Sequence, residues 1–428
     1  MYEQVEEVTS KSSESTYLFS CTNDTVDKWH VKGGLESIRI SPFGTRDLDR
    51  SVEDPEAATL KYTLQAIAAT PDGHPDLPQM HGALGVLYTD KYRNTGSIED
   101  LGAALGYNLA AVAATPIGHP DWNGRCQNLA VSYTEKYKLT GEIQSLEGAL
   151  RYNLAAVAAT PEGDHSLSDS YINLVISYTD KYQRTGDLED LGEALKYNLI
   201  AISTTPSSHL SLAERQENVA GLYMDKYRQI GDSEDLEASI RHDLLAVAMT
   251  PENHPILSSR QFNLALSFSY RYSQTDDLKD LEAALKYKLL ALANTSDGHP
   301  AFGIQCQSLA TSYIDRYRRT GDINNLEDAL KFNMTALRAT PEGHPDLAGR
   351  YHNLATAYSD RYQRSGYSED LEANLRNNIA AVSATPDDDP MLPTRLQNLA
   401  ASYTDRFRRT GDLQLQKAIL NSPGDTTA

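Results

Sequence analysis

A repeat of 45 residues is the feature that most constrains the fold of this chain. Thr-Pro dipeptides recur at one spacing, beginning at Thr70, Thr115, Thr160, Thr205, Thr250, Thr340 and Thr385. The one double gap, from Thr250 to Thr340, contains Thr295 followed by Ser296 in place of proline. A fixed period of this length is typical of solenoids, in which each repeat packs only against its neighbours. It overrules the two or three domains that 428 residues would otherwise suggest.

Each repeat contains two helical patterns separated by a glycine. In the repeat that ends at Pro161, apolar residues of the first pattern fall at Leu129, Ala130, Tyr133 and Tyr137. Those of the second pattern fall at Ala149, Leu150, Leu154, Ala156 and Val157. Gly141 suits a left-handed helix end, and Pro161 stops the second helix. We therefore expect a first helix from Arg125 to about Leu139 and a second from about Leu146 to Thr160.

Three positions recur across the repeats. Alanine stands at Ala66, Ala111, Ala156, Ala201, Ala246, Ala291, Ala336 and Ala381, which predicts a close approach of helices that a larger side chain would push apart. Glycine stands at Gly96, Gly141, Gly186, Gly231, Gly321, Gly366 and Gly411, with Asp276 as the exception. A tyrosine series that begins with Tyr92, Tyr137 and Tyr182 is predicted to lie in the core.

The order of these residues resembles a tetratricopeptide repeat. Leu129-Ala130-x-x-Tyr133, Gly141, Ala149 and Pro161 follow its Leu-Gly-x-x-Tyr, Gly, Ala and Pro, with 11 extra residues in each repeat. The phrasing LEDLEAALKY…AATPEGHPDL…NLAxxYTDRYQRTGD is similar to the long repeats of fungal aromatic-di-alanine and CHAT-associated tetratricopeptide proteins. The resemblance covers about residues 51–420. It implies an all-α, right-handed α-solenoid of eight tandem helix-pair repeats, without a CHAT domain in this chain.

The two ends of the chain depart from the repeat. Residues 1–50 contain YLFSC, KWHV and LESIRI, which we interpret as short strands of an N-terminal arm or of a β-rich remnant. Near the other end, GDLQLQKAIL is predicted to be a ninth second-type helix, followed by a disordered tail at 421–428. Because the repeats reach this end, no effector domain is expected in this chain.

Composition narrows the choice of partner and compartment. A net charge of −20 argues against nucleic acid and anionic membranes and favours a neutral or basic protein or peptide. The N-terminus lacks the pattern of a secretory signal. Three cysteines, Cys21, Cys126 and Cys306, cannot form a disulfide framework, so we expect a cytoplasmic protein. The sequence leaves the partner and the oligomeric state undetermined.

No sequence motif predicts catalysis. The phosphate loop, the dinucleotide fingerprint, His-Glu-x-x-His and Gly-x-Ser-x-Gly are all missing, so we expect no enzyme and no cofactor. A histidine column recurs in the loop after each Thr-Pro, at His74, His119, His209, His254, His299 and His344. Stacked helices lie about 8–10 Å apart, too far for ligands that must each lie about 2 Å from one zinc ion. We expect no metal, and we expect this loop to turn the chain, with Asp76, Asp121 and Asp346 as helix caps.

Two polar columns on the first helix are the candidate binding residues. An asparagine recurs at Asn128, Asn173, Asn218, Asn263, Asn353 and Asn398, with Ala83 and Ser308 as exceptions. An acid follows seven residues later, as in Asp180 and Asp225, with Tyr270 as the exception. Seven residues are two helical turns, so both columns share a face. By the tetratricopeptide resemblance this face lines a concave groove, and the asparagines clamp a peptide backbone.

Alternative interpretations remain open at this stage. The asparagines could instead form hydrogen bonds between repeats, and the acids could form helix salt bridges such as Asp180–Arg184 or ladders with the basic residue that follows each acid. The cluster of departures at Tyr270, Asp276, Ser296 and Ser308 could be drift, a bend or a specificity pocket. A scaffold is our first hypothesis. The alternative is a sensor or oligomerisation module of a caspase-like or nucleotide-binding immune or cell-death system whose effector lies elsewhere.

Overall fold

The computed structural model describes residues 55–411, except for 162, 165, 207 and 208. Across these described residues the chain forms sixteen helices and no strand. The predicted strands within 1–50, the predicted helix at GDLQLQKAIL and the tail at 421–428 lie outside the described residues.

Two kinds of helix alternate along the chain. The first helix of each repeat, which we call the A helix, is α3 (Leu77–Thr95), α5 (Trp122–Thr140), α7 (Leu167–Thr185), α9 (Leu212–Ile230), α11 (Leu257–Thr275), α13 (Phe302–Thr320), α15 (Leu347–Ser365) and α17 (Leu392–Thr410). The second, the B helix, is α2 (Pro55–Ala69), α4 (Ile98–Ala113), α6 (Ile143–Ala159), α8 (Leu188–Thr204), α10 (Ser233–Ala248), α12 (Leu278–Ala293), α14 (Ile323–Arg338) and α16 (Ser368–Ser383).

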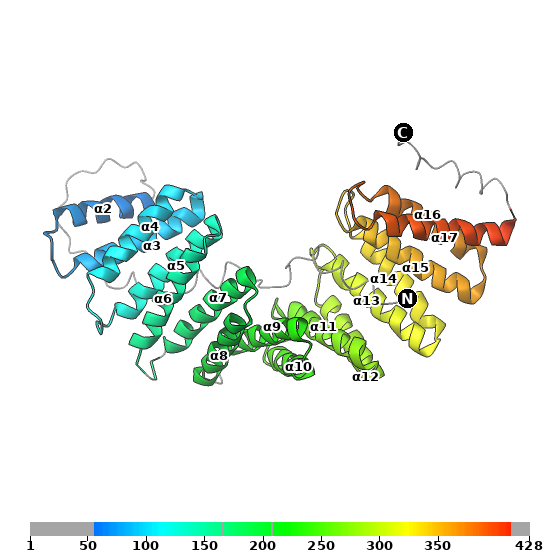
Figure 1. Ribbon diagram of the computed structural model, residues 1–428, viewed down its shortest axis with the longest axis horizontal. Helices are drawn as coiled ribbons and strands as arrows, with labels where there is room; N and C mark the ends of the chain where they lie inside the picture. Colours follow the sequence, from blue (N-terminus) through cyan, green and yellow to red (C-terminus); the bar gives the residue numbers. More distant parts are fainter. Residues whose placement is uncertain (1–54, 162, 165, 207–208, 412–428) are drawn as a thin grey trace. The chain divides into compact units, whose positions relative to one another are not determined.

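Within each of two compact units, consecutive helices pack as hairpins, and consecutive hairpins pack on each other (Figure 1). The chain divides into two compact units, Met1–Lys226 and Tyr227–Ala428. In the first unit α3 packs on α4, α4 on α5, α5 on α6 and α6 on α7, and the A helices α3, α5 and α7 also touch one another in turn. In the second unit the same order runs from α10 to α17. The predicted all-α solenoid of helix pairs is confirmed.

The turn between the two helices of a repeat is as short as the glycine predicts. In the repeat of α5 and α6 it consists of Gly141 and Glu142. Gly141 has a φ of 68°, and its N–H donates to the carbonyl of Tyr137 at 2.7 Å. Both helices begin three residues earlier than the apolar pattern predicted, because their first turns carry mostly polar or small residues.

A hydrogen bond explains why threonine recurs in the Thr-Pro dipeptide. In all eight repeats the threonine hydroxyl donates to the carbonyl of the recurrent alanine four residues earlier, as Thr160 does to Ala156 at 2.7 Å. In several repeats an arginine of the next A helix donates to that hydroxyl, as Arg260 does to Thr250 at 2.7 Å. The threonine thus satisfies a helix-end carbonyl and joins two repeats. From Ala111 to Ala381 the recurrent alanines are buried, whereas Ala66 in α2 is exposed.

Two aromatic positions pack differently from each other. The B-helix tyrosine stacks on an A-helix aromatic in its own hairpin, as Tyr152 does on Tyr133 with ring centroids 5.8 Å apart. The series predicted to be core lies closer to the surface. Tyr182 is buried, but Tyr92 and Tyr137 are only half-buried, because they stand in the last turns of A helices, near the hairpin turns.

Asp276 is the one residue other than glycine with a positive φ, 54°, in the described part of the chain. Side chains in this region cost roughly 1–2 kcal/mol, and the exposed ion pair of Asp276 with Arg319 recovers little of it. We predict that Asp276→Gly stabilises the second unit by about 0.5–1 kcal/mol. Gly321→Asp, at φ 71°, should destabilise it by a similar amount. Urea unfolding measures both, and a less stable Asp276→Gly variant would contradict this account.

Candidate functional site

All the predicted groove residues lie on A helices. They are Asn128 on α5, Asn173 and Asp180 on α7, Asn218 and Asp225 on α9, Asn263 and Tyr270 on α11, Ser308 on α13, Asn353 on α15 and Asn398 on α17. Each is half-buried except Tyr270, which is 37% exposed. We call the surface formed by the asparagine and acid columns the A face.

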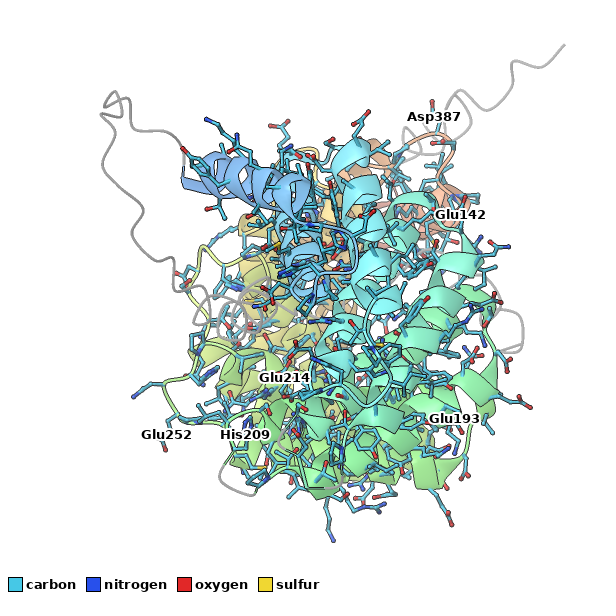
Figure 2. All side chains as sticks on the ribbon, turned by 90° about the vertical axis from the view of Figure 1, so that its left-hand side faces the viewer. Glu142, Glu193, His209, Glu214, Glu252 and Asp387 are labelled. Carbon is cyan, nitrogen blue, oxygen red and sulfur yellow. The ribbon has the colours of Figure 1, made fainter. Side chains whose placement is uncertain are left out.

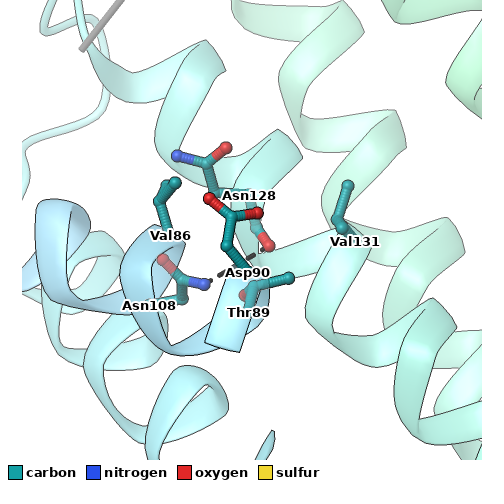
Figure 3. Close-up of a pocket in the computed structure, with 6 residues that line it drawn as sticks. All are labelled: Val86, Thr89, Asp90, Asn108, Asn128 and Val131. Carbon is teal, nitrogen blue, oxygen red and sulfur yellow. Dashed lines mark hydrogen bonds between the residues drawn. The ribbon is translucent and has the colours of Figure 1, made fainter. Parts of the chain in front are cut away.

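An asparagine of one repeat meets the acid of the repeat before it. Figure 3 shows Asn128 and Asp90 beside a small open pocket between α3 and α5. Val86, Val131 and Thr89 line its sides, and Asn108 of α4 forms its floor. At this junction the asparagine and the acid come from neighbouring A helices.

A second polar column, which the sequence analysis missed, lies beneath the A face. It occupies one position on each B helix from α4 to α16, at Asn108, Asn153, Asn198, Asp243, Lys288, Asn333 and Asn378. Every one of these side chains is buried, with at most 5% of its surface exposed. We call these residues the floor column. Their recurrence at 45 residues was visible in the sequence, but the apolar neighbours were assigned to packing and the polar residue between them was overlooked.

The floor column makes the hydrogen bonds that join repeats. Asn153 donates from Nδ2 to Ser177 Oγ at 3.0 Å and to the carbonyl of Asn173 at 3.2 Å. Asn108 bonds in the same way to Ser132 Oγ and the carbonyl of Asn128. These bonds fix the backbone of the A-helix asparagines from below.

The side chains of five A-helix asparagines are left without such bonds. Among the described residues no hydrogen bond engages the side-chain amides of Asn128, Asn173, Asn218, Asn353 and Asn398. An amide carries both donors and an acceptor, so each of these side chains can bind a peptide unit of a ligand.

The floor column differs from repeat to repeat. Asn198 stands opposite Leu222, one repeat on from Ser177, and both its side-chain polar atoms are buried without a hydrogen bond. Asp243 instead accepts from Ser267 at 2.8 Å. Lys288 replaces the amide by an ammonium and still donates to Ser312 Oγ at 2.7 Å and to the carbonyl of Ser308 at 3.3 Å.

The predicted salt bridges within helices are not formed. Asp180 makes no ion pair with Arg184, and the corresponding pairs of Asp315, Asp360 and Asp405 are likewise not formed in the described part of the chain. The half-buried carboxyl of Asp180 lies near Lys138 and Glu135 of α5, while Arg184 is exposed. Some acids pair between repeats, as Glu135 does with Arg93 at 3.1 Å, whereas Asp405 pairs within its own helix with Arg408 at 3.6 Å.

Burial raises the pKa of several carboxyls of the acid column. Desolvation raises the pKa of the Asp180 carboxyl to about 6, although Lys138 opposes the shift. Desolvation also raises the pKa of Asp315 and Asp360, against the nearby Arg318. These carboxyls therefore take up protons at a higher pH than exposed aspartates do.

The basic residue after each acid locks the hairpin. Arg271 forms a bidentate contact with Asp280 in the first turn of its own B helix, and its Nη1 reaches Glu237 of the preceding B helix at 2.8 Å. Arg361 repeats both contacts, with Asp370 and Glu327. These ion pairs form the ladder between repeats. The guanidinium groups therefore hold the repeats together.

The histidine column acts in the loops. In six repeats the ring Nδ1 accepts the backbone N–H two residues on, as His119 does from Asp121 at 3.1 Å. Asp76, Asp121 and Asp346 make no side-chain cap, so the predicted capping role passes to the histidine. Figure 2 shows His209 on such a loop. In the described part of the chain no three His, Cys, Asp or Glu side chains are grouped to hold a metal.

The two described cysteines are poorly suited to nucleophilic chemistry. Cys126 and Cys306 are fully buried, and desolvation raises the pKa of both thiols to about 11. Among the described helices none is both long and apolar enough to cross a membrane.

Comparisons with known proteins find likenesses among solved structures alone. No family model and no curated protein matches this chain. A putative kinesin light chain from Podosopora anserina, with nearly identical tetratricopeptide-like repeats, is 17% identical over 49% of this chain and 95% of its own, with a TM-score of 0.37. The quorum sensor NprR from B. thuringiensis is 16% identical over 75% and 81%, with a TM-score of 0.41. Human IFIT1 with PPP-AAAA is 15% identical over 85% and 80%, with a TM-score of 0.38. The 45-residue helix-pair repeat of this chain resembles a tetratricopeptide repeat.

Lys288 generates a prediction about stability. Burial lowers the pKa of its ammonium to about 8, opposed by the charge of Asp315. The unfolded chain therefore binds more protons than the folded one between pH 8 and about 10.5, so the free energy of unfolding rises with pH across that window. We predict that Lys288→Asn stabilises the second unit by on the order of 2–3 kcal/mol at pH 7. This advantage should shrink towards zero by pH 10.5.

Hydrogen exchange of the α12 and α13 amides, compared between the two proteins across this pH range, measures the local effect. An advantage for Lys288→Asn that stays constant with pH would show that the charge of Lys288 is not the cause.

Proposed function

We propose that this protein is an interaction scaffold whose A face holds an extended peptide segment of a partner protein, and that it binds without catalysing a reaction. The asparagine column carries this proposal. The floor column and the ion pairs of Arg271 and Arg361 hold the repeats together. The side-chain amides of Asn128, Asn173 and Asn218, in consecutive repeats, are half-buried and engaged by no described residue.

The chemistry of the column fits a backbone ligand. Each amide donates one hydrogen bond and accepts another, which matches a peptide unit whatever its side chain. The rigid helix pairs beneath hold these amides in place, so little conformational entropy is lost on binding. The acids beside them favour neutral or basic side chains at most junctions, and a nucleic-acid backbone would meet repulsion.

The resemblance to fungal aromatic-di-alanine and CHAT-associated tetratricopeptide proteins favours a particular kind of partner, a caspase-like or nucleotide-binding protein. The sensor hypothesis differs from the scaffold hypothesis in what the A face holds. Recovery of a caspase-like or nucleotide-binding protein on the wild-type A face, and its loss from an A-face variant, would favour the sensor. A cytoplasmic location is part of the same proposal.

Removing the free amides tests the proposal. Nonapeptides that the wild-type protein selects from a randomised display library, and that photocross-link to α5, α7 or α9, serve as the probe. We predict that the triple variant Asn128→Ala, Asn173→Ala and Asn218→Ala binds them at least about tenfold more weakly, because each lost hydrogen bond leaves a buried ligand group unpaired at about 1–3 kcal/mol. Its stability should hardly change, since alanine favours helix and these amides bond to no described residue.

The floor column supplies the matched control. Asn108→Ala with Asn153→Ala removes two amides one helix away that do bond between repeats, so this variant should lose about 1–3 kcal/mol of stability per site. While folded, it should keep its affinity for the selected peptides. If the A-face triple variant melts far lower and binds normally, the column is architectural.

A further inference from the structure

The junction of α11, α12 and α13 breaks the pattern of the other junctions in three places at once. Tyr270 takes the place of the acid, Ser308 takes the place of the asparagine, and Lys288 takes the place of the floor amide. By the repeat register these three positions correspond to Asp90, Asn128 and Asn108, which line one pocket in Figure 3. The three departures therefore fall on a single pocket position.

Lys288 places a positive charge below this junction. No nearby group fully neutralises that charge. Its side chain is 3% exposed, and its ammonium donates to Ser312 Oγ and to the carbonyl of Ser308. An ammonium has three donors, and no third acceptor and no carboxylate engages it among the described residues. Asp315 influences its ionisation from beyond ion-pair distance. A buried cation in this state gains from a further anionic partner.

The two other replacements prepare the same position for an anion. Tyr270 removes the negative charge that the acid brings elsewhere and presents a hydroxyl. Arg228 lies 5.2 Å from the centre of the Tyr270 ring and donates to its hydroxyl oxygen at 3.3 Å. The phenolic O–H is then left to donate. Ser308 has a shorter side chain than asparagine, and it adds another hydroxyl donor at this position.

We propose that this junction binds the carboxylate of one Asp or Glu side chain of the peptide held on the A face. The hydroxyls of Ser308 and Tyr270 contact the carboxylate directly, and the flexible stem of Lys288 brings its ammonium up to it. The single positive charge of Lys288 matches the single negative charge of a carboxylate. A phosphate group carries a second negative charge, which the carboxyl of Asp315 on α13 repels. This inference rests on the proposed peptide-binding function and deepens it.

The neighbouring junctions extend the recognition pattern. Asp315 and Asp360 stand at the same position on the next two A helices and favour basic side chains. Packed helices lie about 8–10 Å apart, and an extended peptide advances about 3.3–3.6 Å per residue. One repeat therefore corresponds to about three peptide residues. The expected ligand carries one acidic residue with a basic residue about three positions away.

The test compares peptide selection by three proteins, using the randomised nonapeptide display library. They are the wild-type chain, Lys288→Asn and the control Lys286→Asn, which removes an exposed lysine from the same helix. Lys288→Asn should fold, because Asn378 makes the same floor bond to Ser402 at 2.7 Å. A fourth protein, Tyr270→Asp, restores the acid at an exposed position without touching the floor.

The wild type and Lys286→Asn should enrich peptides with one acidic residue about three positions from a basic one. Lys288→Asn and Tyr270→Asp should lose the acidic preference, with at least about a tenfold lower affinity for these peptides, while the basic preference stays. An acidic preference that survives in Lys288→Asn would overturn this inference and leave the peptide-binding function standing. If the wild type enriches no peptide, both fail. Tighter binding of a synthetic peptide with phosphoserine at the acidic position than of its Asp counterpart would overturn the carboxylate assignment alone.

Discussion

The hydrogen bonds from the floor column are the contacts on which the rest of the structure depends. Where a serine of the next A helix faces the floor column, a B-helix amide donates to its hydroxyl, as Asn153 does to Ser177 and also to the carbonyl of Asn173. Leaving a buried amide unpaired, as Asn198 is, costs about 1–3 kcal/mol. The bond therefore sets the register between repeats, and the asparagines of the A face are not needed for that task.

Much of the fold could be predicted from the sequence because its causes are local and recur every 45 residues. Gly141 ends a helix through its own backbone conformation, and Pro161 stops the next one through its ring. The recurrent alanine and the Thr-Pro dipeptide were also visible, although the hydrogen bond from Thr160 to Ala156 that explains them was not. That bond joins a side chain to a helix-end carbonyl, which a pattern of apolar residues cannot show.

The division of labour between polar columns could not be predicted, because it depends on contacts between repeats. Asn128 and Asn108 are the same residue type at the same period, and only packing makes one half-buried and the other a floor residue. The acids illustrate the same limit. A spacing of four residues permits Asp180 to reach Arg184, but the neighbouring A helix lies closer to the carboxyl. Residues 1–50 stay a prediction, since they lie outside the described part.

Identical repeats do not define where along the A face a peptide binds. The residues that depart from the repeat can define it. If every junction were equivalent, a peptide shifted by one repeat would make the same contacts at the same free energy, and several registers would be populated equally. A hydrogen bond to a charged group contributes about 1.5–3 kcal/mol, enough to favour one register by roughly tenfold or more. Lys288, Tyr270 and Ser308 make one junction opposite in charge to its neighbours. Specificity in such an array therefore comes from the places where the repeat is broken, while the repeat itself supplies the stable surface.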